Sequence, residues 1–345
     1  MSESVTTEQA RSFQASTYNG YPLYERTDPD TPLMIMMCGL PGSGKSTYAE
    51  SILVATPADD EFNLISHPEI HSSDALRKEM FGDEATQGDN QKLFRELHSR
   101  IKSDLLNGKD VIYDATNIKK KERIEFLKQL SKIKCFPICV VMVASIGMCH
   151  VHNRLRERNV PGEVINRMFR NWTPPHYSEG FDYIDYIFDK ADCLVTVYDY
   201  MICADLFDQK NSHHSLSLGE HSRRAVEYIF NRNPNNFNLL MAARLHDNGK
   251  LYTKSTVNAK GEDDGDCHYY QHQNCGAYYS LMYLHGDGGY TNEDMAYISN
   301  IVYYHMHPYI QWKSSERVKQ RDKELLGAKL FNDIMLLHEA DLYAH

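Results

Sequence analysis

The sequence predicts two domains, an α/β domain with a parallel sheet followed by an all-helical domain, and three observations support this fold class. From residue 31 to residue 200, short apolar runs alternate with helix-like stretches, as in a parallel sheet covered on both faces. Beyond residue 200 the strand signal is lost and long helical segments remain. The chain has 345 residues, 42% of them hydrophobic, which is too long for one ordinary core.

The first predicted element is a buried strand at Leu33–Cys38, an apolar run between Pro32 and Gly39, and a helix should follow from about Ser46. Further strands are expected at 62–65, 110–113, 137–144 and 194–198, and helices at 90–106, 118–132 and 163–170. We expect a loosely packed extension over residues 1–30, the α/β domain over 31–200 and the helical domain over 205–345.

Composition narrows the class of protein. No apolar run reaches the ~18–20 residues that cross a bilayer, and the first 30 residues do not resemble a secretory signal. The eight cysteines are scattered without a C-x-x-C pair, which indicates reduced thiols and a cytoplasmic protein. A net charge of −10 argues against non-specific coating of nucleic acid. Eleven of the 17 histidines lie beyond residue 200, which suggests metal chemistry in the second half.

A phosphate-binding motif follows the first strand. The segment Gly39-Leu-Pro-Gly-Ser-Gly-Lys-Ser-Thr47 fits G-x-x-x-x-G-K-[ST] between a strand and a helix. Its glycines let backbone N–H groups face a β-phosphate, Lys45 can reach the β- and γ-phosphates, and Ser46 can help to hold Mg²⁺. The predicted nucleotide-binding residues are Gly39, Gly42, Ser43, Gly44, Lys45, Ser46 and Thr47.

Candidate acceptor-site residues follow later strands. Asp74 and Arg77 stand three residues apart at the start of a predicted helix, where a carboxylate can accept a hydroxyl proton and an arginine can hold a phosphate. The alternative is that Asp74 caps the helix and Arg77 is solvated. Asp114 and Asn117 come at the carboxyl end of another strand, where ligands bind in such sheets.

An arginine-rich segment, Asn153–Pro161, precedes the predicted helix at 163–170. It contains Arg156 and Arg158, which on a closing segment could stabilise charge on a transferred phosphoryl group; a solvated basic helix face is the alternative. Between residues 119 and 134, seven basic residues accompany an amphipathic helical period. They form either a local basic face or simply the solvated side of that helix.

These motifs, G-x-P-G-S-G-K-S-T, S-x-D-x-x-R, D-A-T-N and an arginine-rich lid running into V-P, together resemble the 5′-polynucleotide kinase family over residues 33–198. The resemblance implies that Asp74 is the general base for a 5′-hydroxyl and that Arg77 contacts the adjacent phosphate of the acceptor. It also implies that Asp114 and Asn117 support the site and that Arg156, with or without Arg158, is the lid arginine.

The second half contains an ordered set of histidines and aspartates. His246 and Asp247 stand together in an H-D-x-G-K segment, and an imidazole and a carboxylate suit a transition metal. One pair cannot make a site, so a fold that gathers further ligands is required. The further candidates are His221, His272, His305 and Asp341.

This ordered set resembles the HD phosphohydrolase superfamily over residues 205–345. The resemblance implies a primary metal site of His221, the His246–Asp247 pair and Asp341, with His272 and His305 recruiting a second ion. Such an ion lowers the pKa of water, so that water can attack phosphorus near neutral pH. Lys250 is a candidate to hold a substrate phosphate. His214, next to His213, is a candidate for the entrance of the site or for a capping or surface role.

The expected function is a bifunctional end-healing enzyme of RNA or DNA. One half would phosphorylate 5′-hydroxyl ends with ATP and Mg²⁺, and the other would remove a 3′-phosphate, 2′-phosphate or 2′,3′-cyclic phosphate with one or two divalent transition-metal ions. Because both halves are acidic, a small-molecule or nucleoside kinase fused to an HD nucleotidase stays open as an alternative. A third possibility is an ATP-gated regulatory module whose HD half has lost catalysis.

Overall fold

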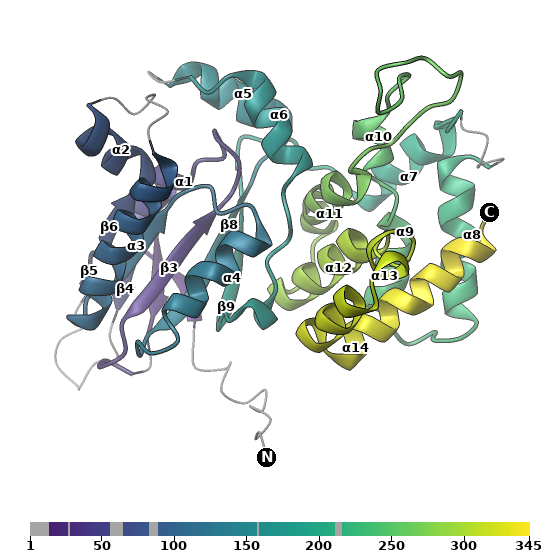
Figure 1. Cartoon of the computed structure of the whole chain (residues 1–345). Helices are drawn as coiled ribbons and strands as arrows, with labels where there is room; N and C mark the ends of the chain where they lie inside the picture. The colour runs from purple at the N-terminus through teal and green to yellow at the C-terminus, as the bar shows by residue number, and fades with distance from the viewer. Residues whose placement is uncertain (1–13, 27, 56–64, 83–88, 157–158, 211–215) are drawn as a thin grey trace. The chain divides into compact units, whose positions relative to one another are not determined.

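The computed structural model describes residues 14–26, 28–55, 65–82, 89–156, 159–210 and 216–345 (Figure 1). The chain divides into two compact units, each built from three separate stretches of the sequence. The N-terminal unit contains residues 1–142, 148–160 and 179–189, and the helical unit contains residues 143–147, 161–178 and 190–345.

A five-stranded sheet organises the N-terminal unit, in the order β6-β7-β3-β8-β9. Its strands are β6 (Glu69–Ser72), β7 (Val111–Asp114), β3 (Leu33–Cys38), β8 (Phe136–Val143) and β9 (Tyr183–Phe188). The pairs β3–β7, β3–β8 and β6–β7 are parallel. All six residues of the central strand β3 are buried, as its uninterrupted apolar run predicts.

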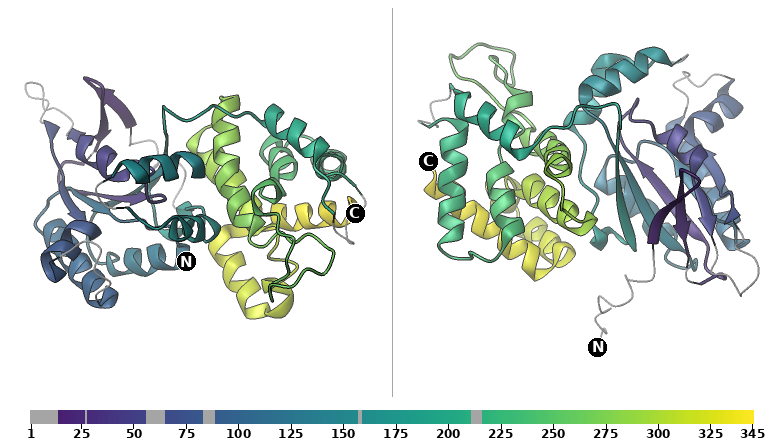
Figure 2. Two further views of the ribbon diagram at one scale, coloured as in Figure 1. Left: turned by 90° about the horizontal axis from the view of Figure 1, so that it is seen from above. Right: turned by 180° about the vertical axis from the view of Figure 1, so that it is seen from behind.

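Other elements of the unit pack on both faces of this sheet (Figure 2). Leu33, Ile35 and Met37 of β3 pack in one cluster with α1 and a smaller sheet, while Met34 and Met36, which alternate with them, are buried on the opposite face. The helices of this unit are α1 (Lys45–Ser51), α2 (Ser73–Phe81), α3 (Asn90–Leu106), α4 (Lys120–Gln129) and α5 (Ile146–Leu155), the last beginning in a segment of the helical unit. The expected parallel α/β architecture is confirmed.

The smaller sheet has the order β1-β2-β4-β5. Its strands are β1 (Gln14–Tyr18), β2 (Tyr21–Glu25), β4 (Leu53–Ala55) and β5 (Ile65–Ser66). Residues 14–25, which lie within the expected N-terminal extension, thus form a hairpin whose second strand pairs in parallel with β4. Of the strand expected at 62–65, only Ile65 lies in the described residues, where it begins β5.

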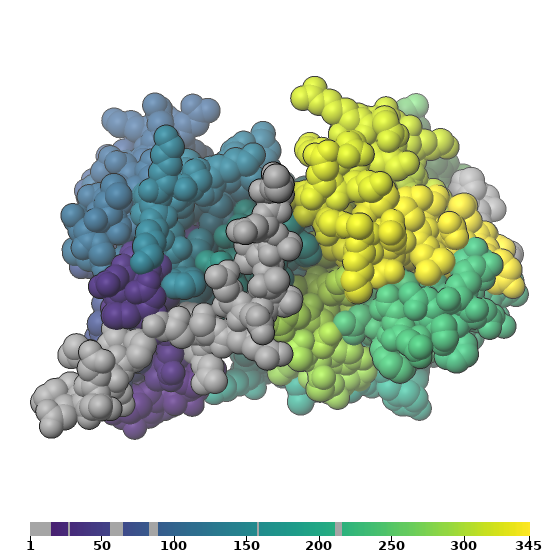
Figure 3. All heavy atoms as spheres, turned by 90° about the horizontal axis from the view of Figure 1, so that it is seen from below, coloured from purple at the N-terminus to yellow at the C-terminus, as the bar shows by residue number. Residues whose placement is uncertain are grey.

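The second unit is helical in its described residues beyond residue 200, as expected. Its helices are α6 (Gly162–Arg170), α7 (Val197–Leu206), α8 (Leu218–Phe230), α9 (Phe237–Leu245), α10 (Lys250–Thr253), α11 (His272–Asp287), α12 (Asn292–Tyr304), α13 (Gln311–Ser314) and α14 (Glu316–Tyr343). A 3-10 turn, Tyr177–Glu179, precedes β9. The C-terminal part of α14 lies at the surface in the face shown in Figure 3.

The strand expected at 194–198 is wrong. Residues 194–196 are irregular and α7 begins at Val197, because Thr196 and Asp199 form a reciprocal capping box that nucleates a helix there. The last strand of the sheet is instead β9, eleven residues earlier in the chain.

Helix α11 forms the core of the helical unit. Residues 274–284 are buried on every side of this helix, and it contacts α12, α10, α7 and α6. A Cβ on Gly249 would overlap the carbonyl oxygen of His272 at the start of α11, so the glycine of the H-D-x-G-K segment is required by close packing. Among the described helices, none is long and apolar enough to span a bilayer.

Candidate active sites

The phosphate-binding loop, residues 39–47, connects β3 to α1. Gly42 and Gly44 have φ angles of 82° and 89°, which L side chains rarely adopt, and a Cβ on Gly42 would overlap the carbonyl oxygen of Cys149. Lys45 is the first residue of α1, and its buried ammonium donates a hydrogen bond of 2.8 Å to the carbonyl of Leu40. The loop therefore has the backbone curl and the cation that bind polyphosphates.

Asp114 lies beside this loop. It ends β7, the neighbour of β3, and its Oδ2 accepts a hydrogen bond of 2.8 Å from the hydroxyl of Ser46. A serine of the phosphate loop paired with an aspartate at the end of the next strand is the usual Mg²⁺ site of P-loop enzymes. The sequence predicted that Asp114 binds substrate and supports the site, and in the structure its carboxylate is bonded to Ser46, the residue that was predicted to help hold Mg²⁺.

Two basic side chains, Lys45 and Arg156, lie close together at the loop. Burial lowers the pKa of Lys45, and the nearby guanidinium of Arg156 acts in the same direction, while the carboxylate of Asp114 opposes both. Arg156 is exposed and immediately follows α5, so the arginine-rich segment begins close enough to the loop to act on Lys45. Arg158 lies outside the described residues.

A side-chain clamp shapes the arginine-rich segment. The buried amide of Asn153 donates to the carbonyl of Val160 at 2.8 Å and accepts from its N–H at 3.0 Å. Beyond it, α6 belongs to the helical unit, where Phe169 packs against the rings of Tyr278 and Tyr279 of α11. Asn153 with Val160, and α6 beyond them, are thus each fixed by contacts within their own unit.

Asp74 and Arg77 lie on α2, which begins directly after β6. The residue that caps this helix is Ser72, whose hydroxyl accepts from the N–H of Ala75, so capping does not account for Asp74. Ser72 pairs in register with Asp114, which places the start of α2 at the same sheet edge as the phosphate loop. Arg77 donates a hydrogen bond of 2.9 Å to Asn90 at the start of α3.

Asn117 has its amide bonded to the backbone of β3, donating to the carbonyl of Met37 at 2.8 Å. Arg123 holds the backbone of Asn117 in place. Its buried guanidinium donates to the carbonyl of Asn117 at 3.1 Å and forms a two-point ion pair with Glu179. Sequence reasoning placed Arg123 among the basic residues of a helix face and missed this role, because Glu179 is 56 residues away. Of the remaining basic residues there, Lys119 and Lys121 pair with glutamates on the exposed side of α4, as a solvated face predicts.

The helical unit gathers a second site from five helices or their ends. His221 is on α8, His246 and Asp247 follow α9, His272 begins α11, His305 follows α12 and Asp341 is on α14. All six side chains are buried, and they form two groups that could each hold a metal ion. The structure therefore brings together all six candidate metal ligands that the sequence suggested.

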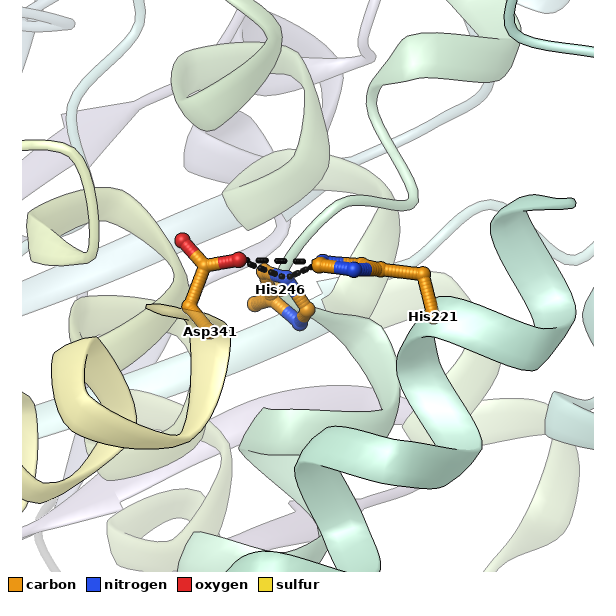
Figure 4. Close-up of side chains that lie close together, drawn as sticks. All are labelled: His221, His246 and Asp341. Atoms are coloured by element: carbon orange, nitrogen blue, oxygen red, sulfur yellow. Dashed lines mark hydrogen bonds and ion pairs between the residues drawn. The ribbon is translucent and has the colours of Figure 1, made fainter. Parts of the chain in front are cut away.

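The first group contains His221, His246 and Asp341, whose side chains point toward one another from α8, the end of α9 and α14 (Figure 4). The two Nε2 atoms are 3.1 Å apart, and Oδ1 of Asp341 is 3.0 Å from Nε2 of His221 and 3.6 Å from that of His246. The second group contains Asp247, His272 and His305. There the two Nε2 atoms are also 3.1 Å apart, and Oδ1 of Asp247 is 3.2 Å from His272 and 3.7 Å from His305.

Asp247 joins the two groups. Its Oδ1 faces the second histidine pair, while its Oδ2 is 3.5 Å from the Nε2 atoms of both His221 and His246. One carboxylate therefore offers one oxygen to each group.

The histidine rings are oriented as metal ligands. The Nδ1–H groups of His246, His272 and His305 donate to the carbonyls of Ala243, Tyr269 and Val302 at 2.7, 2.8 and 2.5 Å. Nδ1 of His221 is 3.4 Å from the carbonyl of Ala344. The Nε2 atoms of each pair then face one another, and two lone pairs at that distance would repel unless a proton or a metal cation lies between them. The nitrogen and oxygen donors fit divalent transition metals.

The charges in this site are strongly coupled. Burial opposes ionisation of both carboxyls. Lys250 and His246 nevertheless hold the pKa of Asp247 well below its usual range. His221 and His246 do the same for the pKa of Asp341. Burial also disfavours charge on His246, yet the two carboxylates outweigh it and raise its pKa to about 9. The cluster thus stabilises positive charge at its centre, which protons and metal ions would compete to supply.

Two further residues contact these carboxylates. Lys250 is buried, with its ammonium 2.7 Å from Oδ2 of Asp247 and 2.8 Å from Oε1 of Gln209. The hydroxyl of Tyr309 donates to Oδ2 of Asp341 at 2.8 Å. Sequence reasoning missed Gln209 and Tyr309, because neither belongs to a motif. The predicted entrance residue His214 lies outside the described residues.

Comparisons with known proteins bear on the N-terminal part of the chain. A family model described as an AAA domain matches residues 34–175. The L-seryl-tRNA(Sec) kinase of Methanococcus maripaludis is 24% identical over 161 residues, which cover 46% of this chain and 60% of that enzyme. The chain thus matches less than two thirds of this relative's length, and the matched part contains a P-loop kinase-like domain.

Two solved structures align with part of this chain. A chain of the Pnkp1/Rnl/Hen1 RNA repair complex aligns at 18% identity and a TM-score of 0.32, covering 40% of this chain and 43% of that one. A gluconokinase from Sinorhizobium meliloti aligns at 17% identity and a TM-score of 0.31, covering 46% of this chain and 82% of that one. The chain therefore contains a P-loop kinase-like N-terminal domain, followed by a helical part.

Proposed function

We propose that the protein is a bifunctional nucleic-acid end-healing enzyme, with a 5′-hydroxyl kinase in the N-terminal unit and an HD-type phosphohydrolase in the helical unit. The observation that carries the proposal is the convergence of six buried His and Asp ligands, with their rings oriented by backbone carbonyls, in a chain that also contains a phosphate-binding loop. A regulatory module without catalysis would have no need for such a set.

In the kinase unit, the phosphate loop and Lys45 bind the β- and γ-phosphates of ATP, and Ser46 with Asp114 would hold Mg²⁺. Asp74 accepts the proton of the acceptor hydroxyl, whose oxygen forms a bond to the γ-phosphorus as the bond to the bridging oxygen of ADP breaks. Arg156 neutralises the transferred group. Arg77, at the same end of α2, holds the phosphate next to the acceptor hydroxyl.

In the helical unit, His221, His246 and Asp341 would hold one ion, and His272 and His305 a second, with Asp247 shared between them. Divalent ions in such sites lower the pKa of water and neutralise charge on a phosphate. Lys250, next to the shared carboxylate, donates to a phosphate oxygen of the substrate. The bond that breaks joins phosphorus to the terminal ribose oxygen, and water supplies the new oxygen.

Two features favour RNA or DNA ends as substrates. The S-x-D-x-x-R segment lies at the sheet edge of the phosphate loop and provides both a base and a phosphate-binding arginine for an acceptor that carries its own phosphate. The tRNA kinase relative also transfers phosphate to an acceptor attached to RNA, as its name states.

The acidic composition favours the second candidate, a small-molecule or nucleoside kinase joined to an HD nucleotidase. The net charge is −10, and the basic face of α4 is partly neutralised by Glu122 and Glu125. Such a surface attracts long polyanions weakly.

An end-labelling assay tests the proposal. The full chain is incubated with Mn²⁺, Mg²⁺, γ-labelled ATP and RNA or DNA oligonucleotides that carry a 5′-hydroxyl and either a 3′-phosphate or, in RNA, a 2′,3′-cyclic phosphate. We expect label on the 5′ end and a free 3′-hydroxyl. Label transfer to free nucleosides or sugars, with none to oligonucleotides, would favour the second candidate.

A further inference from the structure

A cavity of about 410 Å³ lies beside the metal cluster, between the loop that follows α12 and helix α14. Its volume is in the range of about 300–1,000 Å³ that is usual for small-molecule sites. Tyr309, Trp312, Met335 and Leu342 supply apolar walls, and none of them belongs to the predicted motifs. Leu342 is 54% exposed although it lies within a helix, which leaves apolar surface available at this position.

Tyr309 connects the cavity to the first group of candidate metal ligands. Tyr309 contributes its ring to the wall and its hydroxyl to Oδ2 of Asp341. Leu342 and His338, which also line the cavity, are the next residue and one helical turn away from Asp341 on α14. Tyr309 is therefore a wall of the cavity and a hydrogen-bond donor to the first group at the same time.

The polar groups of the cavity suit an aromatic ligand that carries negative charge. Lys313 is exposed and Lys319 is half-buried, and within the described ranges neither forms an ion pair. His338 packs edge-on against Tyr309 at 4.4 Å, and among the residues described its buried Nδ1 has no hydrogen-bond partner. Burial lowers the pKa of His338, with Asp341 opposing, so the ring is neutral and can both donate and accept.

Trp312, an apolar wall of the cavity, is held in a fixed position. Its indole N–H donates to Asp322 at 3.0 Å, and its ring packs on Phe331 at 4.8 Å. The wall is thus preformed and does not have to be ordered on binding.

We propose that this cavity binds the base of the terminal nucleotide whose phosphate is removed at the metal cluster. The proposal rests on the phosphohydrolase function above and specifies its substrate, since a base held beside Tyr309 leaves its ribose phosphate directed toward Asp341. Lys313 and Lys319 then face the neighbouring phosphate of the nucleic-acid strand.

Kinetics of the full chain loaded with Mn²⁺ test the proposal. Two RNA oligonucleotides with a 3′-phosphate are compared, one with a normal terminal base and one whose last nucleotide is abasic. Loss of the base should raise KM by about tenfold or more, because base–aromatic stacking is commonly worth that much. Equal KM values for the two ends would overturn the proposal while leaving the phosphohydrolase function intact.

Matched variants locate the effect. His338→Leu should raise KM several-fold for the normal end and leave the abasic end unchanged, and Lys319→Glu should raise KM for both ends. Arg317→Glu, the same charge change at an exposed position of α14 that does not line the cavity, should have little effect. Unchanged KM in both cavity variants would also overturn the proposal.

A binding measurement separates failure of the cavity from failure of the catalytic function. The chain has two tryptophans, so in a Trp172→Phe variant the fluorescence reports on Trp312 alone. Adenosine should change this fluorescence in a saturable manner, ribose should not, and His338→Leu should weaken the response. A saturable change in a protein that hydrolyses neither end would support the cavity as a base site and refute the phosphohydrolase. No change with adenosine would refute the cavity.

Discussion

In the N-terminal unit, the candidate phosphate-binding groups come from nine consecutive residues, whereas in the helical unit the six candidate metal ligands come from five helices or their ends between His221 and Asp341. The loop at 39–47 is held by backbone conformation, with two glycines at positive φ. The metal cluster is held by packing, with each histidine ring oriented by a carbonyl of its own element or of a neighbouring one.

This difference predicts different sensitivities. A site made by one short loop depends on a few local residues, and changes elsewhere in the fold should affect it weakly. A site made by several helices depends on the position of each helix, so it should respond to packing changes far from the ligands. Substitutions in the two units can test this contrast.

The largest effect is expected from Asp247→Asn. The change removes the charge that both histidine pairs share, so phosphohydrolase activity should fall by about 10³-fold or more while kinase activity stays the same. End-specific assays with one oligonucleotide measure both activities. Asp263→Asn, at an exposed position of the same unit, is the control and should change neither. Retained hydrolysis would show that Asp247 does not join two ions.

Lys45→Ala should produce the reverse pattern. It removes the buried ammonium of the phosphate loop, so phosphoryl transfer should fall by about 10²–10³-fold with hydrolysis intact. Lys132→Ala, at an exposed position beyond α4, is the matched control. If Lys45→Ala also lowered hydrolysis of the 3′ end, the two sites would not be chemically independent.

The same contrast explains how much could be predicted from the sequence. The phosphate loop could be read directly, since its residues are adjacent and its strand and helix follow from local patterns; the helix at 90–106 was also predicted with its observed bounds. The interaction of Ser46 with Asp114 could not be read, because it depends on which strand pairs with β3.

In the helical unit, family resemblance suggested the candidate metal ligands. It did not suggest the residues that hydrogen-bond to the cluster or to Lys250. Tyr309 and Gln209 are placed by tertiary packing, and nothing in their sequence neighbourhood marks them. The prediction at 194–198 was wrong for a local reason. Its β-branched residues suggested a strand, whereas the capping box of Thr196 and Asp199 starts a helix there. The hairpin at 14–25 was missed because its partner, β4, is distant in sequence.

Tyr309→Phe is expected to have an intermediate effect. It keeps the ring that lines the cavity and removes the hydroxyl that orients Asp341, so metal affinity or hydrolysis should fall by about 10–100-fold. Titration of the metal-free protein with Mn²⁺ measures the affinity. If the affinity is unchanged and only KM rises, Tyr309 acts on the substrate and does not position the ligand.

Gly249→Ala is the smallest change and the most direct test of the contrast. The added methyl would overlap the carbonyl of His272, so the start of α11 must move, which should cost about 1–3 kcal/mol of stability and weaken metal binding at the second histidine pair. Thermal unfolding and Mn²⁺ titration measure the two effects. Gly147→Ala, where the nearest atom to an added Cβ is 3.8 Å away, is the control and should unfold normally. If Gly249→Ala bound metal as tightly as the unchanged chain, the cluster would tolerate helix displacement, and its dependence on packing would be no greater than that of the phosphate loop.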